Sequence, residues 1–556
     1  MPVKLNTLDI AAPGFYGLNK QQSSTSLPRG WSLEANNCVI DSSGRVAARK
    51  GHLKVTTTPL AGTPDIESMH EYLDATGAVE IVSAANSKLY TGTVTLTEKT
   101  GSLTITDDNW KFQNFNGSVI GVQDSHNPIH YDGTGNFTLL HDEIPDWQAA
   151  TAYALGDVVK STSGNETIYF HCTTAGTTDG SEPTWDTTVG NTTADNTATW
   201  TTRQFPAGDE CLSAFGRVWI VDSTKSVIYY SDLLIGYKFS GGSAGSIDLK
   251  SVWVYGMDEI IALSAFNGHL AIFGKKSIIV YSGPDDPDNM SLVEQVDGIG
   301  CIARDTVHDI GTDLWFLSDT GLRGFNRTIQ EKSMPVGDIS KNVRDYFRSF
   351  YSSEDKSLIR SGYHDVEGFY IINLPTTGIT FCFDTRARLE DGSARVTTWD
   401  MVSPTAICSA RDGTLYFGKE GYVSKYDGYR DNESTYIMTY KSSWNDFGDS
   451  SIIKIPKRMS YLFLGGANYT ITSTLGFDYS DSAVEEQKTL SNSSPSEWGI
   501  FEWGEGQWSG GSSYENVSFM PRKSGYVIQY GFKLTVNNIA ISLQKINLLV
   551  KTGKLA

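Results

Sequence analysis

Two motifs contain residue types that could carry out catalysis or bind a metal ion. Gly241-Gly242-Ser243-Ala244-Gly245 matches the G-x-S-x-G pattern of serine hydrolases, in which a strained strand-to-helix turn presents the serine. Here a Gly/Ser run leads into Ile247-Asp248-Leu249, which is typical of a strand, so the pattern favours a flexible loop. His126 and His130 have the i,i+4 spacing of a helical zinc pair. Pro128 lies between them and predicts a turn and a strand instead.

Acidic loops could bind calcium or form turns like those of sialidases. Residues 284–289 are acidic enough for a calcium loop, but they lack the glycine and the distal glutamate of an EF-hand. Residues 318–321 and 411–414 are similar to the Asp-box turns of sialidase propellers, without their full spacing or closing tryptophan. No pair of carboxylates stands out as a glycosidase acid and nucleophile. We therefore predict no catalytic residue, no metal site and no cofactor, and we expect that the protein is not an enzyme.

Aromatic side chains of a Thr-rich segment point to sugar binding. Flat indole and phenol rings can stack on sugar rings, as they do in carbohydrate-binding modules. The candidate carbohydrate-binding residues are Trp147, Tyr153, Tyr169, Trp185 and Trp200, with Trp185 and Tyr153 expected to be the most exposed. The alternative, which we favour, is that these side chains form the core of a module too small to fold otherwise.

A second aromatic group lies near the C-terminus. Trp498, Phe501, Trp503 and Trp508 fall within eleven residues among glycines. This spacing is compatible with a locally packed loop, which is slightly favoured. It also fits an anchor patch for another subunit, so Trp498, Trp503 and Trp508 are candidate subunit-interface residues.

The candidate residues are expected to lie on short β-strands and the turns between them, because the spacing of apolar residues almost nowhere has the period of a helix. Runs of Val, Ile, Tyr, Phe and Thr alternate with Asn-Gly, Asp-Gly and Thr-Gly turns. The clearest helix is predicted over residues 339–350, where apolar residues recur with helical spacing. The chain is therefore predicted to be all-β.

The strand pattern repeats about seven times. Each copy is an apolar strand, a tight turn and a second apolar strand, and most copies continue into a third strand that ends in an aromatic residue. The copies lie at residues 69–82, 110–122, 212–220, 263–272, 307–317, 359–373 and 406–418. A pitch of roughly 40–50 residues is typical of a β-propeller. We predict a propeller of six to eight blades, with stacked β-sandwiches as the alternative.

The repeats suggest four segments. Residues 1–60 form an N-terminal arm with the first strands, and residues 61–430 form the propeller. An inserted module at residues 146–203 interrupts the propeller. Residues 431–556 contain longer alternating strands and are expected to form a separate C-terminal β-domain.

Composition excludes several classes of protein. The 556 residues include 45 Lys and Arg against 64 Asp and Glu, a net charge of −19, which argues against wrapping DNA or binding an anionic membrane. The six cysteines are scattered singly, so neither a disulfide scaffold nor a thiolate metal site is expected. No signal peptide or membrane-spanning run is evident. We expect a soluble protein without membrane insertion, made in a reducing cytosol.

The insert resembles small chitin-binding-like β modules found in glycoside hydrolases and phage tail proteins. The resemblance rests on the Tyr-x-x-Gly-Asp-Val-Val element at residues 153–159 and on Pro183-Thr184-Trp185. What it implies is a carbohydrate-binding-like module, with a host-surface glycan as a candidate partner.

The rest of the chain resembles the tail nozzle of short-tailed bacteriophages, also called the tail hub or stabilisation protein. The N-terminal motifs are Gly17-Leu18-Asn19, Leu27–Trp31, Ala35–Asp41 and Gly44–Gly51. They are followed by Asn267–Gly274, Ser277–Tyr281, Gly298–Cys301, Asp313–Ser318 and Gly531–Leu534. Together these motifs span about residues 1–140 and 205–556.

This resemblance implies a virion structural protein at the phage tail tip, assembled in the bacterial host cytoplasm. It implies a homohexameric ring below the portal and adaptor that contacts needle or fibre proteins. The ring continues the channel for genomic DNA, which passes without specific binding. The alternative hypothesis is a lectin-like β-propeller that binds host glycans through the insert.

Overall fold

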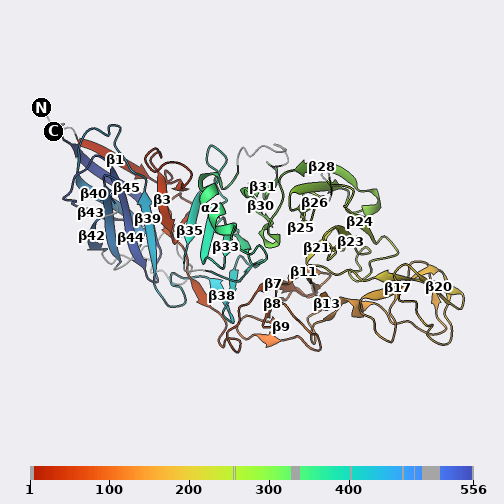
Figure 1. The fold of residues 1–556 in the computed structure, drawn as a ribbon. Coiled ribbons are helices and arrows are strands. Elements are labelled where there is room, and N and C mark those ends of the chain that lie inside the picture. Colours follow the sequence, from red (N-terminus) through yellow and green to blue (C-terminus); the bar gives the residue numbers. More distant parts are fainter. Residues whose placement is uncertain are drawn as a thin grey trace.

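A computed structural model describes residues 5–124, 126–253, 256, 258–326, 328, 338–400, 403–465, 469–480, 483–490 and 514–553. The molecule is elongated, with a β-sandwich at one end, a propeller in the middle and the insert at the other end (Figure 1). The interface candidates Trp498, Trp503 and Trp508 lie outside the described residues.

Seven antiparallel blades can be traced in the described part of the propeller, which confirms the predicted fold class. Six of them are separate small sheets, and blade 6 is one end of a ten-stranded sheet. Blades 1 to 3 are β7–β10 (Ser68–Leu73, Val79–Ala85, Lys88–Thr91, Thr97–Glu98), β11–β14 (Lys111–Phe115, Ser118–Gln123, His126–Tyr131, Thr138–Leu139) and β21–β24 (Glu210–Ala214, Arg217–Val221, Val227–Tyr230, Gly245–Asp248). Blades 4 and 5 are β25–β28 (Ile260–Phe266, His269–Gly274, Ser277–Ser282, Ser291–Asp297) and β29–β31 (His308–Asp309, Leu314–Ser318, Gly321–Gly324). Blades 6 and 7 are β32–β35 (Arg360–His364, Phe369–Leu374, Ile379–Asp384, Val396–Trp399) and β36–β38 (Ala406–Ser409, Leu415–Lys419, Tyr422–Tyr426) with β6 (His52–Lys54).

The ring closes because the first strands of blades 1 and 7 contact each other. Strand β6, from the N-terminal part of the chain, completes blade 7 by pairing with β38. Each predicted hairpin corresponds to the first two strands of one blade. At the Asn116-Gly117 and Asn267-Gly268 turns both residues have positive φ, the backbone twist that tight hairpins need.

Blade 5 has only three described strands, and a helix lies beside the third. The helix α2 (Arg344–Tyr351) follows a 3-10 turn at Lys341–Val343, close to the predicted range 339–350. It buries Phe347 and Tyr351 in the same core cluster as Trp315 and Tyr370. The helix therefore extends the core of the propeller at blades 5 and 6.

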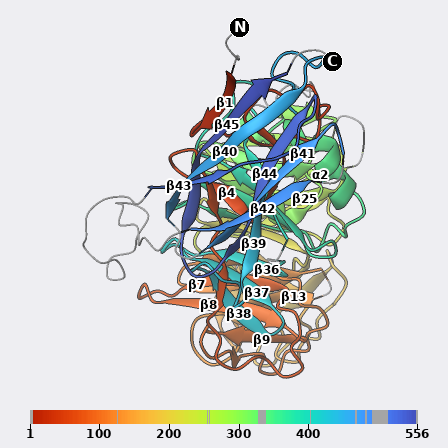
Figure 2. The same cartoon turned by 90° about the vertical axis from the view of Figure 1, so that its left-hand side faces the viewer.

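The sandwich is assembled from both ends of the chain (Figure 2). One sheet has the order β4-β5-β45-β40-β43, with β1 paired to β45. These strands are Cys38–Ile40, Val46–Ala48, Ile541–Thr552, Lys454–Gly465 and Tyr514–Phe519, and β1 is Leu5–Ala11. The other sheet runs from β35 through β3 (Trp31–Asn36), β39 (Tyr436–Ser442), β44 (Ile528–Val536) and β41 (Thr470–Phe477) to β42 (Val484–Thr489). Strand β2 (Gly17–Leu18) pairs with β3.

The observed organisation differs from the expected segments in two respects. The described residues 5–60 are not an arm separate from the C-terminal part, because β1 pairs with β45 along its whole length and β3 is a central strand of the sandwich. The C-terminal β-domain is not separate, because a single ten-stranded sheet joins blade 6 to the sandwich through β35 and β3. Such long-range pairings leave no local pattern in a sequence.

Two chain segments cross side by side between propeller and sandwich. Arg49 donates two hydrogen bonds to Asp431, at 2.8 and 2.6 Å, and both side chains are almost fully buried. The Arg49 guanidinium also lies 4.2 Å from the ring centroid of Tyr436. Gly51 packs directly against the backbone of Arg430. We call residues 49–52 and 426–436 the neck.

The insert is a small β module that is packed firmly against the propeller. Its sheet has the order β16-β17-β20-β19 (Val158–Val159, Ile168–Thr174, Ala198–Gln204, Thr192–Asp195), and β15 (Ala152–Tyr153) pairs with β18 (Gly176–Thr177). Tyr169 and Val158 share a core cluster with Phe115 of blade 2 and Val218 of blade 3. The insert is therefore part of the propeller's packing and not a tethered appendage.

Candidate functional site

The G-x-S-x-G motif forms the loop against which the insert packs. A side chain on Gly241 would meet the backbone of Gly156 of the insert, and one on Gly242 would meet the carboxylate of Asp232. The Ser243 hydroxyl donates to Asp232 (2.9 Å) and accepts from Arg217 (3.0 Å). No helix follows the serine, since Gly245 begins strand β24. The motif therefore has a packing role, and its glycines permit close backbone approach.

The other candidate motifs are turns and strands. His126 and His130 both lie on β13, where the pair lacks the helical geometry of a zinc site. His126 contacts the carbonyl of Asn127 (2.6 Å), and His130 lies 3.4 Å from Glu143. In the loop at 411–414 the carboxylate of Asp412 accepts the backbone N–H of Thr414. Within the described residues, no group of three His, Cys, Asp or Glu side chains is placed to hold a metal ion.

A largely buried charge cluster, in which Lys111 and Asp305 keep some exposure, lies on the axis of the propeller. The carboxylate of Asp305 accepts hydrogen bonds from Lys111 (3.2 Å) and Arg304 (3.0 Å) and lies 3.4 Å from Arg360. Burial alone would raise the pKa of Asp305, but the three cations hold it well below its usual range. Burial raises the pKa of nearby Glu210 to about 7.

These side chains leave only a small axial cavity. Its volume is about 500 Å³, and its lining includes Lys111, Asp305 and Arg360, a size typical of a small-ligand pocket. Arg360 is fully engaged, because it also donates to carbonyls of Glu67 and Ser357.

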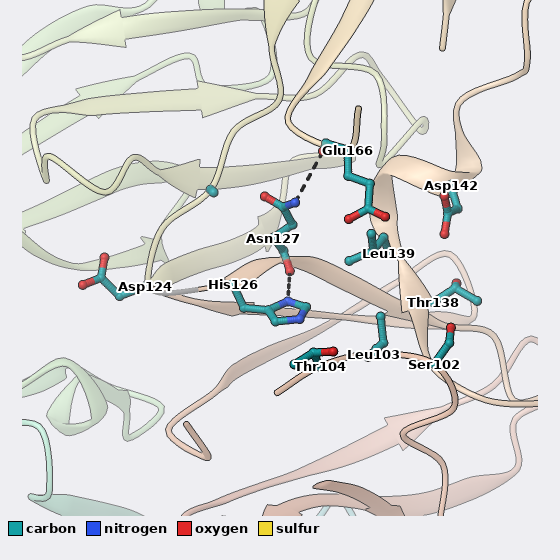
Figure 3. Close-up of a pocket in the computed structure, with 11 residues that line it drawn as sticks. Ser102, Leu103, Thr104, Asp124, His126, Asn127, Thr138, Leu139, Asp142 and Glu166 are labelled. Carbon is teal, nitrogen blue, oxygen red and sulfur yellow. Dashed lines mark hydrogen bonds between the residues drawn. The ribbon is translucent and has the colours of Figure 1, made fainter. Parts of the chain in front are cut away.

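A pocket of about 590 Å³ lies between blade 2 and the insert (Figure 3). Its carboxylates belong to Asp124, Asp142 and Glu166, and Figure 3 shows them spread around the pocket. Asn127 donates to the backbone carbonyl of Glu166 (3.5 Å), which bridges the blade and the insert. The carboxylates do not converge on a common point, so this pocket offers neither an acid–base pair nor a cation cage.

Three of the five sugar-binding candidates are core residues. Trp147, Tyr169 and Trp200 are at most 6% exposed, so their ring faces are not available to a sugar. The indole N–H groups of Trp147 and Trp200 both donate to the buried carboxylate of Asp195, at 2.8 and 3.1 Å. This corrects the sugar-binding assignment of these three residues, because the small module needs large side chains to form a core.

The remaining two candidates, Tyr153 and Trp185, are half-buried. Trp185 stacks on Phe170 with ring centroids 3.7 Å apart and planes 15° apart, and its indole N–H donates to Glu182 (2.7 Å). The Tyr153 ring packs edge-on against Trp200.

A groove of about 430 Å³ runs beside Trp185, and we call it the insert groove. Its floor includes Phe170 and Ile168, and its polar rim includes Ser161, Ser163 and Asn165. Sequence reasoning missed Phe170, although alternation along residues 168–172 places it on the opposite face of the strand from Tyr169. An aromatic platform with a polar rim can bind a polyhydroxylated ligand.

Comparisons with known proteins found similarity to solved structures at low sequence identity. No protein-family model and no curated protein matches the chain. The chain is similar to PorZ, a surface component of the type-IX secretion system of Porphyromonas gingivalis (12% identity, TM-score 0.32), over 72% of this chain but only 44% of PorZ. It is similar to the WD40 domain of Neurospora crassa Pan2 (9% identity, TM-score 0.35) over 68% of this chain and 95% of that one. The WD40 domain of Toxoplasma gondii coronin matches 76% of this chain over 86% of its own length (10% identity, TM-score 0.29). No helix in the described part of the chain is long and apolar enough to cross a membrane.

Proposed function

We propose that the chain is a virion structural protein, a subunit of the tail nozzle ring of a short-tailed bacteriophage. The observation that carries this proposal is the ordered set of sequence motifs that resembles the nozzle family, because it covers both the sandwich and the propeller. Several of those motifs hold the two parts together. Asn36 and Asn37 donate to Asp400 (both 2.6 Å), and Asn37 accepts from Arg49 of the neck (3.0 Å).

The distribution of charge supports a role beside DNA. Residues 61–431, which form the propeller and the insert, contain 50 Asp and Glu against 27 Lys and Arg. Residues 1–60 and 432–556, which supply most of the sandwich, contain 14 Asp and Glu against 18 Lys and Arg. An acidic propeller repels the phosphates of a passing duplex. In the proposed ring, the passage for the duplex lies between subunits.

The proposal predicts that the chain is a stoichiometric component of purified particles. Mass spectrometry of gradient-purified virions should detect the chain, and a gold-labelled antibody should bind at the distal tail. Absence of the chain from particles that contain the other tail proteins would contradict the proposal. An antibody against the capsid protein is the matched control.

A second candidate function is binding of a host-surface glycan by the insert, favoured by the insert groove. Trp185→Ala should abolish binding on a glycan array, because it removes the aromatic platform. Glu182→Gln should weaken binding by loosening the indole, and Leu155→Ala, which is exposed on the insert and not part of the groove lining, should leave it unchanged. No binding of the intact chain to any arrayed glycan would contradict this candidate.

A further inference from the structure

Two surfaces of the chain carry opposite charge around exposed apolar side chains. The first lies on the sandwich, in the connection between β43 and β44. Met520 is 68% exposed and Tyr526 is 45% exposed, and Arg522 and Lys523 are exposed between them. We call these four residues the basic sandwich patch.

The acidic groups beside this patch are turned toward the backbone. Asp478 accepts the N–H groups of Tyr526 (2.5 Å) and Val527 (3.1 Å), and Glu486 accepts the N–H of Met520 (3.3 Å). No ion pair to Arg522 or Lys523 occurs among the described residues. Lys523 lies 5.5 Å from the ring centroid of Phe477. With respect to the described residues, the patch therefore presents two cations without an ion-pair partner next to apolar side chains.

The second surface is the outer edge of blade 4. Leu292 and Val293, on the edge strand β28, are 48% and 52% exposed. The loop before that strand presents the exposed carboxylates of Asp285, Asp286 and Asp288. We call these five residues the acidic blade edge, and in Figure 1 β28 lies far from the sandwich.

The loop is held in place by its own contacts. Asn289 donates to Asp286 (2.8 Å), and Tyr230 donates to Asp288 (3.3 Å). A 3-10 turn at Pro287–Asn289 shapes the loop. The carboxylates are thus presented on an ordered turn beside the two aliphatic side chains, instead of on a loose acidic tail.

We propose that the basic sandwich patch of one copy docks on the acidic blade edge of a second copy. This inference rests on the proposed function, because a ring of identical subunits needs two different complementary surfaces on each subunit. The composition of the basic sandwich patch is typical of an interface, since aromatic residues, Met and Arg are enriched in interfaces. The two patches match in charge, which selects partner and orientation. Within one molecule the two patches lie too far apart to meet.

A charge swap tests the contact in the purified full-length chain. Arg522→Glu with Lys523→Glu should weaken self-association about tenfold or more in sedimentation velocity at low salt. Asp285→Lys with Asp286→Lys should do the same. The chain that carries all four changes should associate again, because the complementarity is restored with reversed sign. Lys533→Glu, on the outer sandwich face where Lys533 pairs with Glu485 (3.4 Å), is the matched control.

A photo-crosslinking residue in place of Met520 identifies the partner. The expected crosslinks join position 520 to peptides that contain Leu292 or Val293 of another copy. Crosslinks to DNA or to other parts of the chain would overturn the proposal. A wild-type chain that stays monomeric would also overturn it, as would a folded variant with all four charge reversals that fails to associate. If particles contain the chain but the swap fails, the docking surfaces are wrong and the nozzle proposal stands.

Discussion

The propeller and the sandwich build their cores differently. The sandwich has one continuous cluster of buried side chains between two sheets. The propeller divides its core into several clusters, most of which lie between neighbouring blades. Each blade therefore depends on its neighbours and on closure of the ring, whereas the sandwich depends on pairing between the two ends of the chain. The neck connects the two parts, because one of its segments leads into β6 of blade 7 and the other leads into β39 of the sandwich.

The largest expected effect comes from the neck. Arg49→Ala removes the guanidinium that makes two hydrogen bonds to the buried carboxylate of Asp431 and leaves the His52 ring as the one described side chain in contact with it (3.2 Å). Removing one partner of a buried ion pair costs about 3–5 kcal/mol. We expect the single unfolding transition in urea to shift to lower concentration and to split into separate propeller and sandwich steps. Arg49→Met combined with Asp431→Asn should recover much of the loss, because no unpaired charge remains. An unchanged transition in Arg49→Ala would show that the ten-stranded sheet alone couples the two parts.

A pH-dependent effect should be confined to the propeller. Burial raises the pKa of Glu210 to about 7, above its value in the unfolded chain. Between about pH 4.5 and 7 the folded state thus binds more protons, so Glu210 lowers the stability as pH rises, by on the order of 3 kcal/mol in total. The stability of Glu210→Gln relative to the wild type should increase over this window. The stability of Glu259→Gln, at an exposed position, should change with pH as that of the wild type does. If the stability of Glu210→Gln also runs parallel to that of the wild type, Glu210 does not have a raised pKa.

A steric change in the neck should have an intermediate effect. A methyl group on Gly51 would meet the backbone carbonyl of Arg430, and overpacking of this kind costs about 1–3 kcal/mol. Gly51→Ala should lower the midpoint of thermal unfolding. Gly180→Ala, at a position with no neighbouring atoms, should not. Equal midpoints of thermal unfolding for the two variants would mean that the neck accommodates the methyl group without loss of stability.

The smallest effect is expected at a propeller turn. The carboxylate of Asp132 accepts the backbone N–H and the hydroxyl of Thr134 (2.8 and 2.7 Å), and these hydrogen bonds lower the pKa of Asp132. The stabilisation is present above the unfolded pKa and is lost as pH falls through the folded one. Asp132→Ala should cost about 0.5–1.5 kcal/mol near neutral pH, and the difference should shrink in acid. Denaturant titrations of both proteins at neutral and acidic pH measure this difference in stability. The same difference at both pH values would exclude the ionised carboxylate as its cause.

Sequence reasoning identified features that are local in the chain. The Asn116-Gly117 and Asn267-Gly268 turns identified hairpins because their positive φ values suit few other residues. The pairing of β6 with β38 and of β1 with β45 could not be predicted, since strands far apart in sequence choose partners through burial and not through local pattern.

The candidate site shows the same limit. The composition of the insert identified its aromatic residues, but not which ring faces stay open. Phe170 covers one face of Trp185, and Asp195 holds two indoles inward. Asp195 is 48 residues from Trp147, so nothing in the local sequence indicates that contact.

Cryo-electron microscopy of purified particles tests the central claim most directly. The account predicts a ring of this chain at the distal end of a short tail, with a channel between subunits and with Met520 of each copy near Leu292 of the next. A tail tip whose density is fully explained by other proteins would contradict it.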